Sequence, residues 1–167
     1  MVERMVSSDW REKLREIVKN ESIMIAKDVI VDLYTAFEKF LKFAGPVLYN
    51  AAKKAGRHMA KVLMERGVVD DRNAVEALLE SIIDAGYASE ARVLGEKDAK
   101  KEKIIEVAMK GTLLGSKLQR KKPVDLPIAG FMAGWLETVY GKHVDVKEVA
   151  CMATGSNECI FQIHIKK

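Results

Sequence analysis

Two cysteines and a glutamate near the carboxy terminus are the residues whose types and spacing could do chemistry. Cys151 and Cys159 are the only cysteines of the chain, and Glu148 lies three positions before the first of them. Thiolates and a carboxylate can bind a divalent metal, and two nearby thiols can also form a disulfide or remain as small buried side chains. The spacing alone leaves these three alternatives open.

These residues fall in a predicted β-hairpin, with strands over 142–149 and 159–167. Side chains of a strand alternate between its two faces. The core-facing set consists of Val144, Val146 and Glu148 on the first strand and Cys159, Phe161, Ile163 and Ile165 on the second. A carboxylate in that position is costly unless it is paired, protonated or bound to a cation. Cys151 has the opposite parity from Glu148, so a bulge or turn is needed for the two to converge.

The elements that must position this hairpin are mostly helical. Apolar periodicity predicts helices over 8–19, 28–44, 46–66, 73–86 and 125–141, a short strand over 22–27, and strands over 88–95 and 103–109. Gly45-Pro46 is predicted to end the second helix and start the third. The second helix is expected to bury Leu33, Phe37, Phe40, Leu41 and Ala44.

The order of the elements predicts an α+β domain, with N-terminal helices packed on one face of an antiparallel sheet. A buried Gly-rich helix precedes the C-terminal β-hairpin. We divide the chain into an N-terminal helical extension over 1–19 and a single domain over 20–167.

Composition narrows the class of protein. The chain has 167 residues, of which 49% are hydrophobic and 31% charged, so it can bury a core. Its net charge is only +4, and the basic cluster 117–123 lacks the aromatic residues of a nucleic-acid site. No apolar run is long enough to cross a membrane, and the N-terminus does not resemble a signal peptide. We therefore expect a cytoplasmic protein that binds neither nucleic acid nor membrane, in a compartment that disfavours a structural disulfide.

Residues 130–163 resemble the C-terminal signature of the 4-vinyl-reductase domain family, and the chain is similar to its stand-alone archaeal members. The pattern is a Gly-rich helix, a strand introduced by glycine, Glu-x2-Cys, a glycine turn, and a second cysteine followed by an aromatic residue. The matching positions are Gly130, Gly134, Gly141, Glu148, Cys151, Gly155, Cys159 and Phe161. The resemblance implies a fold shared with nitric-oxide-type sensors and with subunits of a vesicle-tethering complex.

The resemblance also implies a structural zinc site. In the aromatic sensors of this family, zinc is held by a glutamate and three cysteines. Glu148, Cys151 and Cys159 match three of these positions, and the fourth falls on Asp125. Aspartate can ligate zinc, but Asp125 is also placed to cap the helix that follows it. Both roles stay open for Asp125.

The resemblance further implies a cavity between sheet and helices that holds a small apolar molecule. Its candidate lining residues are Tyr49, Ile105, Met109, Phe131 and Trp135, although aromatic residues on a buried helix are commonly plain core. A homodimer is expected through a second apolar face of the N-terminal helices, with Tyr34, Phe43 and Val47 as examples.

The function predicted from these features is binding or sensing of a hydrophobic or aromatic small molecule. No phosphate loop, nucleotide fingerprint or nucleophile–base pair is visible, so no catalytic residue is predicted and we expect binding rather than catalysis. The alternatives are a reductase-related enzyme of tetrapyrrole-type metabolism and a non-enzymatic scaffold or adaptor. His58, His143 and His164 are expected at the surface or in a second layer.

Overall fold

The computed structural model describes residues 9–23, 25–41 and 44–167. Apart from a strand predicted over 22–27, helices and strands follow the predicted order. They are α1 (Asp9–Asn20), α2 (Lys27–Phe40), α3 (Ala44–Glu65), α4 (Ala74–Asp84), β1 (Glu90–Asp98), β2 (Glu102–Lys110), α5 (Leu126–Tyr140), β3 (Val144–Ala150), a 3-10 turn η1 (Met152–Thr154) and β4 (Cys159–Lys166).

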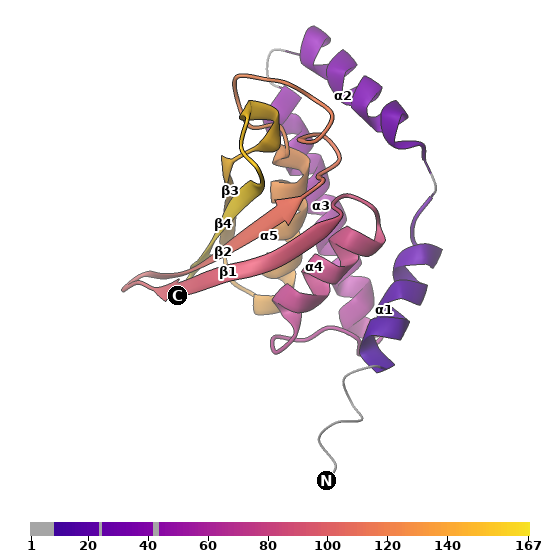
Figure 1. The fold of residues 1–167 in the computed structure, drawn as a ribbon. Coiled ribbons are helices and arrows are strands. Elements are labelled where there is room, and N and C mark those ends of the chain that lie inside the picture. Colours follow the sequence, from indigo (N-terminus) through magenta and orange to yellow (C-terminus); the bar gives the residue numbers. More distant parts are fainter. Residues whose placement is uncertain (1–8, 24, 42–43) are drawn as a thin grey trace.

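The four strands form one antiparallel sheet in the order β1-β2-β4-β3. Strand β4 lies between β2 and β3 in the sheet, although it follows β3 in the sequence. Helix α5 connects β2 to β3 and so spans the position of β4. Helices α4 and α5 cover the same face of the sheet, with α3 behind α5 and α1 against α4 (Figure 1). The predicted fold class, α+β with helices on one face of an antiparallel sheet, is confirmed.

Helix α5 is buried between the sheet and α3, as its nearly all-apolar sequence predicted. Three glycines allow the two helices to approach closely. A Cβ atom at Gly130 would overlap the carbonyl oxygen of Tyr49, one at Gly134 that of Lys53, and one at Gly56 that of Phe131. Only residues without side chains fit at these contacts, so the pair α3–α5 forms a rigid support for the sheet.

Helix α1 packs on α4 through one apolar stripe, in which Leu14 is fully buried. Ion pairs flank that stripe, between Arg11 and Glu76 and between Arg15 and Asp84. Within the described residues, none of the helices combines the length and the apolar character needed to cross a bilayer.

Two predictions about the N-terminal half were wrong. Within 22–27, the described residues form no strand, and Lys27 already begins α2; residue 24 lies outside the described residues. Gly45-Pro46 does not end a helix, because α2 ends at Phe40 and Pro46 lies in the first turn of α3. Proline is compatible with a first helical turn, whose amides have no partner inside the helix.

The predicted buried face of α2 is also wrong. Leu33, Phe37 and Phe40 are exposed, with 50%, 42% and 84% of their surface accessible. Leu41 is exposed as well, whereas Ala44 is buried at the start of α3. Amphipathic periodicity shows that a helix has an apolar side but not what covers it. Here α2 lies at the margin of the helical layer and buries Tyr34, while Leu33 and Phe37 stay uncovered (Figure 1).

Candidate functional site

A bulge in β3 brings Glu148 and Cys151 to one side of the sheet. Glu148 pairs with Phe161 and Ala150 pairs with Ile160, so Val149 is the extra residue between them. The bulge reverses the alternation of side chains after Glu148. Cys151, which follows Ala150, therefore faces the core, and the predicted need for a bulge or turn at this place is confirmed.

Two carboxyl side chains and two thiols converge in this region. Asp125, Glu148, Cys151 and Cys159 each offer an atom to one cluster, whose atoms all lie within 4.8 Å of one another. The two sulfur atoms are 3.9 Å apart and are not bonded, and the Sγ atom of Cys159 is 3.3 Å from Oδ2 of Asp125. Both cysteines and Asp125 have no accessible surface. The residues predicted as metal ligands are thus brought together.

Asp125 occupies the N-cap position of α5, but its side chain makes no capping hydrogen bond. Its Oδ2 atom accepts a 2.7 Å hydrogen bond from the hydroxyl of Thr112, and its Oδ1 atom is buried without a partner. The Oε1 atom of Glu148 is also buried without a partner. Two unsatisfied carboxylate oxygens in one buried cluster are costly, and a bound cation would satisfy both.

Burial makes the charged forms of this cluster unfavourable. It raises the pKa of Glu148 to about 9, with the neighbouring Cys151 thiol and Asp125 carboxylate acting in the same direction. Burial also raises the pKa of Asp125. The Cys159 thiol donates to the sulfur of Cys151, which raises the pKa of Cys159 and lowers that of Cys151. A divalent cation would reverse this balance, because it stabilises thiolates and carboxylates together.

The distances suit a tetrahedral zinc ion. Sulfur atoms at about 2.3 Å from tetrahedral zinc lie about 3.8 Å apart, and a sulfur and a carboxylate oxygen about 3.6 Å apart. The observed separations are 3.9 Å between the sulfurs and 3.3 Å from Cys159 to Asp125. Backbone amides already donate to two of the groups, from Met152 to the Cys159 sulfur at 3.2 Å and from Asp125 to Glu148 at 2.8 Å. The chemical types of the four donors and these two separations therefore fit zinc.

Sequence reasoning missed two residues of this centre, Thr112 and Gly115. Thr112 is fully buried, and its hydroxyl lies 3.3 Å from the Cys159 sulfur in addition to its bond to Asp125. A Cβ atom at Gly115 would be 2.6 Å from Oδ2 of Asp125 and 2.9 Å from that sulfur, so a side chain there would enter the cluster. The only signal was a threonine inside the short apolar stretch 111–115, between two glycines.

A second feature is an apolar cavity among α3, α4, α5 and the segment that joins α1 to α2. Its volume is about 400 Å³, and a neighbouring cavity of about 290 Å³ shares part of its wall. Ala55, Ile82, Tyr87 and Phe131 line both. Cavities of this size hold small organic molecules in other proteins.

The five predicted lining residues are not gathered around this cavity. Phe131 lines it, while Ile105, Met109 and Trp135 are fully buried in the core. The indole of Trp135 donates to the carbonyl oxygen of Ala74, and the hydroxyl of Tyr49 lies 3.5 Å from Asp145. The sequence did not mark Ala55 and Ile82 as lining residues of a cavity, because the shape of a cavity wall depends on how the helices pack against one another.

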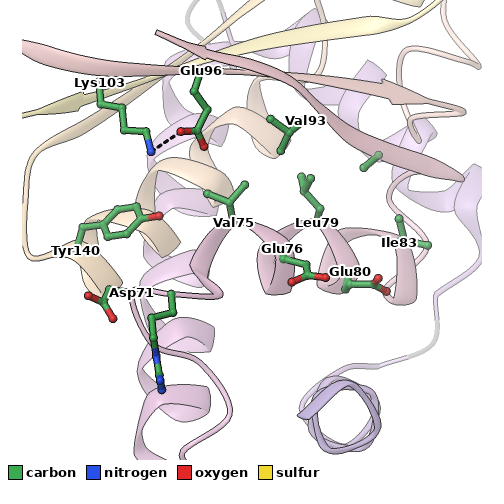
Figure 2. A pocket seen from close by; sticks show the side chains of 12 residues that line it. Asp71, Val75, Glu76, Leu79, Glu80, Ile83, Val93, Glu96, Lys103 and Tyr140 are labelled. Atoms are coloured by element: carbon green, nitrogen blue, oxygen red, sulfur yellow. Dashed lines mark ion pairs between the residues drawn. The ribbon is translucent and has the colours of Figure 1, made fainter. Parts of the chain in front are cut away.

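A groove between α4 and β1 is the third hollow, with a volume of about 450 Å³. Figure 2 shows Val75 and Leu79 of α4 facing Val93 of β1 across it, with the ion pair of Glu96 and Lys103 at one end. This groove lies between helix and sheet, as the predicted cavity did, but its rim is charged.

The three histidines lie outside the group formed by Asp125, Glu148, Cys151 and Cys159, which we call the acid–thiol cluster. His143 is largely exposed, and its Nδ1 atom is 3.2 Å from Glu137. His164 lies 3.4 Å from Glu102 at the outer face of the sheet. His58 is exposed on α3 and lines the apolar cavity.

The fold and the cluster together define an α+β domain in which a buried acid–thiol centre joins the start of α5 to the C-terminal hairpin. Residues 105–165 match the V4R domain, which confirms the resemblance predicted from residues 130–163. The match covers the part of the chain from β2 to β4, which includes all four residues of the cluster.

One curated relative matches in sequence, the uncharacterized protein MJ1460 of Methanocaldococcus jannaschii. The match is 35% identical over 46 residues, and it spans 28% of this chain and 28% of that protein. The structure is also similar to a vinyl-4-reductase family protein from Methanocaldococcus jannaschii, with a TM-score of 0.60, 20% identity, and 95% and 94% of the two chains covered.

Other solved structures share the fold at low identity. The phenol-responsive sensory domain of the transcription activator PoxR, solved with phenol, has a TM-score of 0.75 at 15% identity, covering 86% of this chain and 76% of that one. A trafficking protein particle complex subunit 3 from Naegleria fowleri, covalently bound to palmitic acid, has a TM-score of 0.61 at 16% identity, covering 84% and 95%. An H-NOX protein from S. oneidensis has a TM-score of 0.53 at 11% identity, covering 95% and 89%. The predicted kinship of fold with sensors and tethering-complex subunits is confirmed.

Proposed function

We propose that this protein binds a small hydrophobic molecule in the cavity among α3, α4 and α5, as a ligand-binding or sensor-like module. The observation that carries the proposal is the cavity itself, about 400 Å³ with an adjoining 290 Å³, walled by Phe131, Ile82 and Met59. The phenol-bound PoxR domain and the palmitate-bound subunit 3 support it, since both carry organic ligands on the same fold.

A cavity-filling substitution tests the proposal. Ala55 lies on the wall of both cavities and is exposed, so Ala55→Phe adds volume there with little effect on the rest of the core. Lys54→Phe, one position away and outside the lining, is the matched control. We expect phenol or 1-decanol to raise the melting temperature of the wild-type protein and of Lys54→Phe, but not of Ala55→Phe. Equal responses of all three proteins would contradict the assignment of the cavity.

We further propose that the acid–thiol cluster binds zinc in a structural role. Glu148, Cys151, Cys159 and Asp125 would hold the ion, which supplies the positive charge that this buried set lacks. Four protein ligands leave no open position, an arrangement typical of structural rather than catalytic zinc. Asp125 and Glu148 would then fix the start of α5 against β3, with the amide of Asp125 orienting the Glu148 carboxylate.

A homodimer through α2 is our proposal for the quaternary state. Val29, Leu33 and Phe37 recur every four residues and leave an apolar stripe of about 12 Å exposed along the helix. Exposed apolar stripes of this kind are commonly covered by a partner. Of the residues predicted for this surface, Val47 is exposed, Tyr34 is buried inside the protomer, and Phe43 lies outside the described residues.

A further inference from the structure

The apolar cavity has a cationic side chain, Lys27, and an imidazole, His58, in its lining. Lys27, the first residue of α2, and His58 of α3 both line it and are both exposed. The one acidic residue of the lining is Glu21, and its carboxylate pairs with Arg66 at 3.2 Å. The charge of Glu21 is therefore balanced by Arg66, which does not line the cavity.

Lys27 is held close to the end of α4. Gly86 follows that helix with a positive φ, and a Cβ atom there would lie 3.6 Å from Cε and 3.9 Å from Nζ of Lys27. Within the described part of the chain, no carboxylate lies within ion-pair distance of the Lys27 ammonium, whereas the next residue, Asp28, pairs with Lys117 at 3.3 Å. The ammonium thus reaches the rim without a counter-charge.

The start of α2 adds to the positive character of this rim. Ala26 is the N-cap of the helix and provides no side-chain hydrogen bond to its first turn. The helix dipole favours negative charge at that end, and the one carboxylate of the first turn, Asp28, is paired with Lys117. Lys27 and Ile30 of the first turn of α2 line the same cavity as His58.

Resting on the proposed function, we infer that the ligand is an amphipathic anion. Its apolar body occupies the space beside Phe131, Ile82 and Met59, and its carboxylate, or a comparable anionic end, lies at the Lys27 ammonium. A neutral apolar molecule would fill the interior but would leave the Lys27 ammonium unpaired. The competing explanation is that Lys27 serves only the folded state, through attraction to the negative end of α4.

Decanoate and 1-decanol separate these explanations because they differ only in the head group. Calorimetric titration of the full chain, below micelle-forming concentrations, should show tighter binding of decanoate. Lys27→Met should weaken decanoate about fivefold, the scale of an exposed ion pair, and leave 1-decanol unchanged. Lys54→Met, which removes an exposed lysine outside the lining, should alter neither. High salt should reduce the advantage of decanoate.

Each other outcome overturns a distinct statement. Equal affinities for the two probes, or an equal loss of both in Lys27→Met, would overturn the anionic head group and leave the cavity assignment standing. A lower melting temperature of Lys27→Met with unchanged selectivity would show that Lys27 acts only on stability. If neither probe binds, both the anionic head group of the ligand and the proposed binding of a hydrophobic molecule are overturned. The comparison of Ala55→Phe with wild type tests the proposed function independently.

Discussion

The backbone amide of Asp125 donates a 2.8 Å hydrogen bond to the carboxylate of Glu148, and so joins the start of α5 to β3 across 23 positions of sequence. The side chain of Asp125 turns away from its own helix and toward Cys159. The side chain of Asp125 therefore does not cap α5, and it lies where the proposed zinc site requires a ligand.

Replacement of Asp125 should therefore lower zinc affinity. Asp125→Asn keeps the size of the side chain and removes its charge, and we expect the zinc affinity, measured by competition with a chromophoric chelator, to fall at least about tenfold. Asp145→Asn changes a partly exposed acid on β3 outside the cluster and should have no effect. Unchanged affinity in Asp125→Asn would remove Asp125 from the ligand set.

Metal removal should expose the dependence of the fold on the cluster. Chelation should lower the melting temperature of the wild-type protein, because it leaves buried acids without a counter-charge. In Cys151→Ser the melting temperature should already be lower, and chelator should change it little further. Elemental analysis that finds no zinc in protein purified without chelator, together with no response to chelator, would favour two free buried thiols.

The close contact of α3 and α5 predicts a large cost for a small substitution. Gly134→Ala places a methyl group against the carbonyl oxygen of Lys53, and we expect a loss of about 1–3 kcal/mol in the free energy of unfolding. Gly95→Ala is the control, since no atom lies within 4 Å of its Cβ position and its φ is not positive. Denaturant titration of both variants measures the difference, and similar values for the two would contradict this packing.

Glu137 should make stability depend on acid pH. Burial opposes its ionisation, but hydrogen bonds from Lys53 at 2.8 Å and Arg57 at 2.7 Å hold the pKa of this carboxyl below its ordinary value of 4.5. The native state then binds fewer protons than the unfolded state, so the contribution is present above pH 4.5 and is lost as pH falls through the lowered pKa.

Glu137→Gln should cost about 1–2 kcal/mol at pH 7, and the difference from wild type should shrink below pH 4.5. Urea titrations of both proteins across this range provide the measurement. Glu65→Gln, at the exposed end of α3, is a control that should track the wild type. A difference that stays constant with pH would mean that Glu137 acts through packing rather than charge.

Disruption of the apolar stripe on α2 should abolish self-association. Leu33→Glu combined with Phe37→Glu places charges on the exposed face without touching the core, and sedimentation should then report a monomer in place of a dimer. Lys39→Glu, an exposed charge change on the same helix, should leave the dimer intact. A wild-type protein that sediments as a monomer at micromolar concentration would contradict the proposal.

The sequence was sufficient to predict the order of elements from the second helix onward, the antiparallel sheet and the inward direction of Glu148 and Cys159. Each depends on local periodicity, since strand alternation and helix stripes are set by backbone geometry. The need for a bulge near Cys151 followed from the same parity, and the structure places it at Val149.

Sequence reasoning failed where the outcome depended on a distant surface. The apolar stripe of α2 is genuine, but only the packing of the other helices shows that Leu33 and Phe37 are left uncovered. Likewise, Thr112 and Gly115 join the acid–thiol cluster because the loop after β2 folds back on β4, which no local pattern encodes.

What the sequence determined by itself is thus the fold class and the presence of two thiols and a carboxylate in the C-terminal hairpin, because periodicity and chemical type are properties of single segments. What only the tertiary structure decided is the convergence of Asp125 with Cys159, the position of the cavity beside Phe131 and Lys27, and the exposure of α2. These depend on how whole elements pack, and packing is set by complementary surfaces that lie far apart in the chain.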